Sequence, residues 1–145
     1  MASSGMFSVT QIASSGLSAE RLRMEIAATN IANADTTRTA NGGPYRRQQV
    51  VFANALEHAT SANAQSHLKG VQVGDIVEDE SELPSVYLPG HPDANGEGFV
   101  QYPNVQMARE MVDLMTASRA YEANLKSLQA FKTMTEQSLA LLKGS

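Results

Sequence analysis

The sequence predicts a mainly α-helical protein, in which long N- and C-terminal helices pack as a coiled-coil-like pair and a small β-rich or irregular segment lies between them in sequence. Three observations predict this class. Apolar residues recur at helical spacing near both ends of the 145-residue chain. All five prolines lie between these ends. Aromatic residues make up only 6% of the chain and tryptophan is absent, so a large aromatic core is not expected.

The N-terminal unit comprises residues 1–34, and its periodicity predicts a helix over 6–34. Two apolar lines run along this helix at spacings of three, four or seven. One line contains Ile12, Ala19, Leu22 and Ile26, and the other contains Ala13, Leu17, Met24, Ala27 and Ile31. Ser3 or Ser4 is a candidate N-cap. The helix is expected to end at Asn33-Ala-Asp35-Thr36-Thr37, because Asn and Asp side chains compete for backbone hydrogen bonds.

The C-terminal unit comprises residues 104–145, with a helix predicted over 104–142 and Asn104 as its cap directly after Pro103. Its apolar residues repeat every seven positions, which is typical of a coiled coil. The d positions are Met107, Leu114, Tyr121, Leu128, Thr135 and Leu142, and the a positions are Met111, Ser118, Leu125, Lys132 and Leu139. Eight of these eleven residues are apolar.

The middle segment, residues 35–103, reads as short strands and turns. Residues 45–52 and 71–77 are strand candidates, and residues 53–68 show little apolar pattern. This segment is too small to cover both helices, so one apolar line of the first helix is expected to stay exposed in a single chain. An exposed line of that length implies a partner, and completion by other subunits is the favoured interpretation. The alternative is a self-contained hairpin with the middle folded over it.

Composition and charge exclude several classes of function. The net charge of −4 does not suit a general nucleic-acid binder. The absence of cysteine excludes disulfides and thiolate chemistry. No apolar run approaches the ~20 residues of a membrane span, and the N-terminus lacks the pattern of a cleaved signal peptide. The protein is therefore expected to stay in the cytoplasm or to leave it by a route that reads no such peptide.

No candidate chemical site is complete. Residues 93–98 match the first half of a calcium loop but lack its closing Glu, so a glycine-rich turn is the preferred interpretation. His58, His67 and His91 lack metal-ligand spacing. The pair Arg46-Arg47 is expected to face solvent or to pair with acids, and the acidic run 78–82 is expected to be a solvated loop. We therefore expect no enzymatic activity, no cofactor and no metal.

Several strings resemble those of flagellar axial proteins, the family of rod and hook components, and in particular its short proximal-rod subunits. The shared axial signature is Asn30-Ile-Ala-Asn-Ala-Asp35-Thr36-Thr37. The longer strings are Gly42-Gly-Pro-Tyr-Arg-Arg-Gln48, Pro89-Gly-His-Pro-Asp-Ala-Asn95, Tyr102-Pro-Asn-Val105 and Glu110-Met-Val-Asp-Leu-Met-Thr-Ala-Ser-Arg-Ala-Tyr-Glu-Ala-Asn124. The resemblance covers residues 6 to 142, and Gln106 is a mild departure from it.

The resemblance implies a structural subunit of the basal-body proximal rod. It implies that the chain assembles helically with itself and with related subunits, transmits motor torque to the hook and forms part of the export channel. The implied partners are proximal and distal rod subunits, a rod–export-gate adaptor and the flagellar type III export apparatus, without nucleic acid or a membrane span. The implied location is the rod within the periplasm. A cytoplasmic coiled-coil adaptor or export chaperone is the alternative that periodicity alone leaves open.

The resemblance also implies roles for particular residues. Asn30, Asn33 and Thr36, with Asp35 and Thr37 beside them, are expected to shape the exit from the first helix. The assembly interface is expected to contain Ile12, Leu17, Leu22, Met24, Ile26, Ile31, Met107, Met111, Leu114, Tyr121, Leu125, Leu128 and Leu139.

Overall fold

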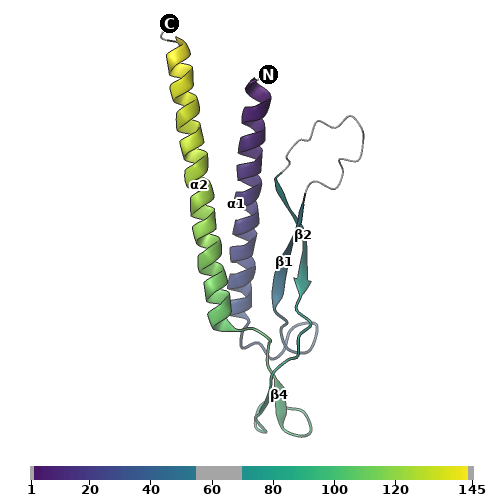
Figure 1. Ribbon diagram of the computed structural model, residues 1–145. Helices are drawn as coiled ribbons and strands as arrows, with labels where there is room; N and C mark the ends of the chain where they lie inside the picture. Colours follow the sequence, from purple (N-terminus) through teal and green to yellow (C-terminus); the bar gives the residue numbers. More distant parts are fainter. Residues whose placement is uncertain (1, 55–69, 144–145) are drawn as a thin grey trace, which may run out of the picture. The chain divides into compact units, whose positions relative to one another are not determined.

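A computed structural model describes residues 2–54 and 70–143 of the chain. The elements follow in the order α1 (Ala2–Ala32), β1 (Gln48–Asn54), β2 (Val71–Glu78), β3 (Ser85–Tyr87), β4 (Phe99–Gln101) and α2 (Met107–Lys143) (Figure 1). The strands form two two-stranded sheets, β1 with β2 and β3 with β4. The prediction of two terminal helices with a small strand region between them is confirmed.

The starts of both helices differ from those predicted. The helix α1 begins at Ala2, so Ser3 and Ser4 lie inside it and neither is its cap. The helix α2 begins at Met107 and not at residue 104. The Asn104 side chain does not cap α2: its Oδ1 accepts from the Arg47 N–H at 2.8 Å, and its Nδ2 donates to the Asp79 carbonyl at 2.9 Å. This side chain ties two parts of the middle segment together instead.

The strands were predicted unevenly. The candidates at 45–52 and 71–77 correspond to β1 and β2, with β1 starting three residues later than predicted. The three-residue strands β3 and β4 were missed, because three residues are too few to show a period of two. They pair antiparallel, with Ser85 opposite Gln101, Val86 opposite Val100 and Tyr87 opposite Phe99. The pattern-poor stretch 53–68 lies mostly outside the described residues, as do His58 and His67.

The chain divides into two compact units. The first is Met1–Arg21, Phe52–Gly74 and Ala117–Ser145, and the second is Leu22–Val51 and Asp75–Thr116. In the first unit, α1 contacts both the start of β2 and α2. The Ser15 hydroxyl accepts from the Val71 N–H at 3.1 Å, and a Cβ built on Gly16 would lie 3.2 Å from the Asn124 side-chain nitrogen.

The expectation that one apolar line of α1 stays exposed is wrong. Both lines are half-buried or buried, and Ala19 and Ala27 are each only 4% exposed. Over residues 9–32, Val9 is the one large apolar side chain of α1 that is exposed. The reason is that α1 is covered on two sides within the chain, by strand residues and by α2. The exposed large apolar side chains lie mainly on α2 and on the strands.

Gly70 precedes β2 at a point where the backbone runs against α1. Its φ is +77°, and a Cβ there would collide with the Ser15 side chain and lie 3.2 Å from the Ile12 Cα. Replacing Gly70 by alanine is therefore expected to destabilise the protein by more than the ~1–2 kcal/mol that a left-handed residue costs. Denaturant unfolding measures the change.

Gly42 provides a matched control for that substitution. Its φ is +82°, and no atom lies within 4 Å of a Cβ built on it. Gly42→Ala should therefore show the cost of the backbone conformation alone. Equal losses for Gly42→Ala and Gly70→Ala would contradict the close approach of residue 70 to α1.

Candidate functional site

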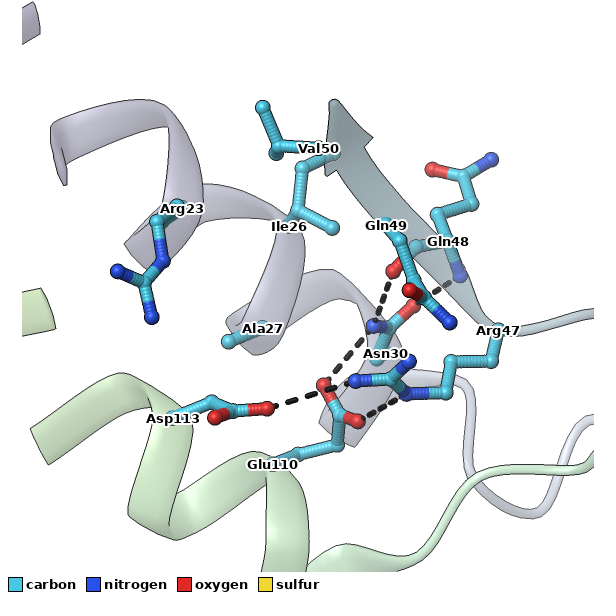
Figure 2. Close-up of a pocket in the computed structure, with 10 residues that line it drawn as sticks. All are labelled: Arg23, Ile26, Ala27, Asn30, Arg47, Gln48, Gln49, Val50, Glu110 and Asp113. Carbon is cyan, nitrogen blue, oxygen red and sulfur yellow. Dashed lines mark hydrogen bonds and ion pairs between the residues drawn. The ribbon is translucent and has the colours of Figure 1, made fainter. Parts of the chain in front are cut away.

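Three polar side chains are buried together in the second unit. Asn30 and Glu110 are each 1% exposed, and Arg47 is 8% exposed. Asn30 lies in the last turns of α1, Arg47 directly precedes β1, and Glu110 lies in the first turn of α2. Figure 2 shows them meeting in a pocket that is also lined by Ile26, Ala27, Val50 and Asp113. We call Asn30, Arg47 and Glu110 the buried polar cluster.

The Asn30 amide uses its full hydrogen-bonding capacity. Its Nδ2 donates to the Gln48 carbonyl and to Glu110 Oε2, each at 2.9 Å. Its Oδ1 accepts from the Tyr45 hydroxyl at 2.8 Å and from the Gln48 N–H at 2.9 Å (Figure 2 shows the bonds to Gln48 and Glu110). A side-chain amide has two donors and two acceptor positions. Asn30 therefore joins α1, β1 and α2 with no polar group left over.

Arg47 supplies the positive charge of the cluster. Its Nε donates to Glu110 Oε1 at 2.5 Å, and its Nη2 donates to Asp113 Oδ2 at 3.4 Å. Its Nη1 lies 3.8 Å from Asp79 Oδ2. A buried carboxylate needs both a counter-ion and hydrogen-bond donors, and Glu110 receives both from Arg47 and Asn30. The Arg46-Arg47 pair was expected to face solvent or to pair with acids, and Arg47 pairs with acids.

Asp79 anchors the acidic run 78–82, which was expected to be a solvated loop. Its N–H donates to the Arg47 carbonyl at 2.7 Å, and its side chain accepts from the Ser81 N–H at 3.0 Å. The hydrogen bond from the Ser81 backbone, with smaller contributions from the Ser81 and Gln49 side chains and the Arg47 charge, lowers the pKa of Asp79. The other acids of the run, Glu78, Glu80 and Glu82, are exposed as expected.

Tyr45 contributes a hydroxyl group to the surroundings of the cluster. Burial raises the pKa of the Tyr45 phenol, and the negative charges of Glu110 and Glu78 raise it further. The phenol therefore stays protonated and donates its hydrogen bond to Asn30.

The cluster links three elements of the chain through hydrogen bonds and ion pairs. Within the described part of the chain, no buried side-chain nitrogen or oxygen lacks a hydrogen-bond partner. The side chains of the cluster bond to one another and to neighbouring groups of Tyr45, Gln48 and Asp113, and these contacts hold the end of α1 and the start of α2 against β1.

Residues 93–98, which match the first half of a calcium loop, make hydrogen bonds and an ion pair within the chain. The Asp93 carboxylate accepts from the Thr37 hydroxyl at 2.8 Å and lies 3.6 Å from the Arg38 guanidinium. His91 Nδ1 accepts from the Asp93 N–H at 3.1 Å. Among residues 2–54 and 70–143, no group of three or more acids and histidines is placed to hold a metal ion. The residues form turns before β4, as the glycine-rich turn interpretation proposes.

The structure distributes the signature residues around the exit from α1. Asn30 belongs to the buried polar cluster. Asn33 Nδ2 donates to the Thr29 carbonyl at 2.9 Å, and Asn33 Oδ1 accepts from the Thr36 hydroxyl at 3.2 Å. The Thr36 carbonyl accepts from the Tyr45 N–H at 3.0 Å. Asp35 is exposed.

The expected interface residues fall into two groups. Half-buried ones are Ile12, Leu17, Leu22, Met24, Ile26, Ile31, Leu114, Tyr121 and Leu128, and exposed ones are Met107, Met111, Leu125 and Leu139. Ile26 lines the pocket beside the buried polar cluster, and the others take no part in it. On α2, the d positions from 114 to 135 are half-buried, whereas the a positions except Ser118 are exposed.

Sequence reasoning missed Glu110 as a functional side chain. One signal was present: Glu110 lies seven residues before Ala117, on the same side of α2 as Ala117 and Asn124. An acid on the buried side of a helix is unusual unless it has a partner, because burying a lone carboxylate is costly. The partner, Asn30, lies 80 residues away, so spacing along the chain does not indicate it.

Comparisons with known proteins match both ends of the chain. The family described as "Flagella basal body rod protein" matches residues 11–38, and "Flagellar basal body rod FlgEFG protein C-terminal" matches residues 97–141. Asn30 lies in the first matched segment and Glu110 in the second, so the Asn30–Glu110 hydrogen bond joins the two. These matches place the chain in the class of flagellar rod proteins.

Full-length relatives narrow the class. The flagellar basal-body rod protein FlgC of Borreliella burgdorferi is 42% identical, over 97% of this chain and 99% of its own length. The FlgC proteins of Bacillus subtilis and Salmonella typhimurium are 40% and 39% identical, each over 94% of this chain, and over 98% and 97% of their own lengths. The chain belongs to the FlgC family of flagellar basal-body rod proteins. Within its described residues, no helix has the length and apolarity needed to span a bilayer.

Proposed function

We propose that this protein is a structural subunit of the proximal rod of the flagellar basal body. It assembles helically with itself and with related rod proteins, transmits motor torque to the hook and forms part of the export channel. Its location is the rod within the periplasm, which it reaches through the type III export apparatus. The observation that carries the proposal is the buried polar cluster, which fixes the ends of two long helices in a chain of the FlgC family.

Burial on the two helices supports the assembly. The helices α1 and α2 act as a coiled-coil-like pair, in which the d positions of α2 from 114 to 135 pack within the subunit. The exposed a positions Met111, Leu125 and Leu139 then remain for neighbouring subunits. Burying such side chains is worth about 25 cal/mol per Å² of apolar area, repeated at every copy. Head-to-tail contacts of this kind extend into open helical assemblies.

We assign different structural roles to three segments of the subunit. Residues 1–34 and 104–145 form the axial helices, and residues 35–103 form the middle segment. The half-buried interface residues of α1 hold this helix against its own chain. Asn30, Asn33, Asp35, Thr36 and Thr37 set the path of the chain as it leaves α1.

A charge at one exposed a position tests the proposal. Leu125 is 37% exposed, so Leu125→Asp should leave the isolated subunit folded while preventing its incorporation into rods. Motility is expected to be lost, since a charge in an apolar contact between subunits is left without a partner. Swimming assays and imaging of basal bodies measure the effect, and circular dichroism of the purified chain checks the fold.

Gln129→Asp is the matched control. Gln129 is exposed one turn further along α2 and lies outside the a and d positions, so the substitution adds the same negative charge away from the proposed interface. It should leave motility intact. Normal rods in the Leu125→Asp strain would contradict the proposed interface. Recovery of the protein only from cytosol, with normal rods in a deletion strain, would contradict the rod function itself.

A further inference from the structure

The β3–β4 hairpin has one open edge. The Leu88 N–H donates to the Gly98 carbonyl and the Tyr102 N–H to the Pro84 carbonyl, each at 2.8 Å. These bonds, with Val86 opposite Val100, place residues 84, 86 and 88 at the hydrogen-bonded positions of the ladder. In an antiparallel pair the alternate residues point their backbone groups outward. The N–H and C=O groups of Ser85 and Tyr87 therefore face away from β4.

The two outer edges of this hairpin differ in whether their backbone groups have hydrogen-bond partners. On β4, the Phe99 N–H donates to Asn95 Oδ1 at 2.9 Å, and the Phe99 carbonyl accepts from the Asn95 N–H at 2.8 Å. On β3, the outward groups of Ser85 and Tyr87 have no partner among residues 2–54 and 70–143. Pro84 and Pro89 bound this edge, so a further strand would pair with only a short stretch.

Apolar side chains surround the open edge. Val86, Tyr87 and Leu88 are 44%, 61% and 39% exposed. The Tyr87 ring meets the Phe99 ring edge-on, with centroids 5.2 Å apart, and Phe99 is itself 40% exposed. Free backbone groups beside an exposed aromatic pair are the elements that a bound strand uses: the backbone gives affinity, and the side chains on alternate positions give specificity.

The charge near this edge indicates which strand fits. Residues 70–103 hold seven acids and neither lysine nor arginine. Glu82 precedes β3 by three residues, Glu97 precedes β4 by two, and both are exposed. Because Phe99 pairs with Tyr87, one carboxylate lies near each end of β3 along the chain. Like charge disfavours a second copy of the same hairpin, whereas a basic segment is complementary.

We propose that the β3 edge binds an extended, basic segment of a partner protein by strand addition. The segment pairs with the backbone of Ser85 and Tyr87, places an apolar side chain on the Tyr87–Phe99 pair, and places lysine or arginine near Glu82 and Glu97. This inference does not rest on the proposed rod function, because the hairpin edge takes no part in the helices.

A defined peptide tests this directly. The end-blocked pentapeptide Lys-Val-Thr-Val-Lys is titrated into the ¹⁵N-labelled full chain while amide resonances are followed by NMR. The Ser85 and Tyr87 amides should shift and gain protection from solvent exchange, with a dissociation constant of about 1 mM or tighter. The matched peptide Glu-Val-Thr-Val-Glu should bind at least about tenfold more weakly. Equal binding of both peptides, or shifts located elsewhere, would overturn the proposal.

Two variants separate the edge from the aromatic pair. Ser85→Pro removes the outward N–H of residue 85 together with the serine hydroxyl. Strands tolerate proline at an edge, so the hairpin should stay intact while binding weakens at least about tenfold. Tyr87→Ser keeps the backbone edge but removes the ring, and should also weaken binding. The Val100 and Gln101 amides report whether each hairpin is intact. Unchanged affinity in both variants would refute the site, and self-association that Ser85→Pro abolishes would assign the edge to a second copy instead.

Discussion

Replacing Arg47 by methionine is expected to lower the free energy of unfolding by about 3–5 kcal/mol, because it leaves the Glu110 carboxylate buried without its counter-ion. Glu110 is 1% exposed and would keep only the hydrogen bond from Asn30. Methionine fills much of the volume of the arginine stem, so the loss reflects charge more than packing. Urea unfolding of the purified chain, followed by circular dichroism, measures the change.

Two further variants make this expectation specific. Arg47→Met combined with Glu110→Gln removes both charges and keeps an acceptor for Asn30, so it should be more stable than Arg47→Met alone. Arg38→Met is the control, since the Arg38 side chain is 75% exposed and its pair with Asp93 should be worth less than about 1 kcal/mol. A double variant that is no more stable than Arg47→Met alone would show that the buried charge is not the source of the loss.

The same cluster shows how far the sequence predicts this structure. Apolar periodicity predicts α1 and α2 because burial on one face of a helix leaves a repeat in the chain. It does not predict which face of α2 meets its own chain. The heptad assignment predicts that the a and d positions form the buried face of α2. The face that is buried instead consists of d positions together with small or polar residues such as Ala117 and Asn124. Large apolar side chains reveal themselves by hydropathy, and small ones at close contacts do not.

The site was predicted in parts and not as a whole. The sequence indicates Asn30 as part of a signature, and it predicts that Arg47 faces solvent or pairs with acids. For the third member, Glu110, the sequence predicts no role of its own, because this residue stands out only as part of a longer string. The bonds joining these residues cross 63 and 80 positions of the chain. Local propensity carries no information at such distances, so only the folded backbone brings the three together.

Exchanging Asn30 for aspartate should produce the largest pH-dependent effect. Near neutral pH, Asn30→Asp would place a second carboxylate where the amide now donates to Glu110 Oε2 at 2.9 Å, and the Gln48 carbonyl would lose its donor. Each buried group left unpaired costs about 1–3 kcal/mol, and repulsion between the carboxylates adds to that. We expect a loss of more than about 3 kcal/mol in the free energy of unfolding, measured by urea titration.

Acid should partly reverse that loss. Two carboxylates in one site raise the pKa of one of them in the folded state above its value in the unfolded chain. The folded variant then binds more protons than the unfolded variant, so its stability relative to wild type falls as pH rises and recovers as pH is lowered. Once protonated, the introduced carboxyl group can again donate one hydrogen bond to Glu110. The deficit should be smaller at about pH 5 than at about pH 7.5.

Asn41→Asp is the matched control for this variant, because Asn41 is exposed and the substitution adds the same charge. Its effect should stay within about 0.5 kcal/mol at both pH values. An Asn30→Asp deficit that is equal at the two pH values would show that lost hydrogen bonds, and not paired carboxylates, account for the effect. If the deficit shrinks in acid, the second carboxylate beside Glu110 is the source of the loss, and the Asn30 amide stabilises the junction of α1 and α2 because it donates to Glu110 without adding a negative charge.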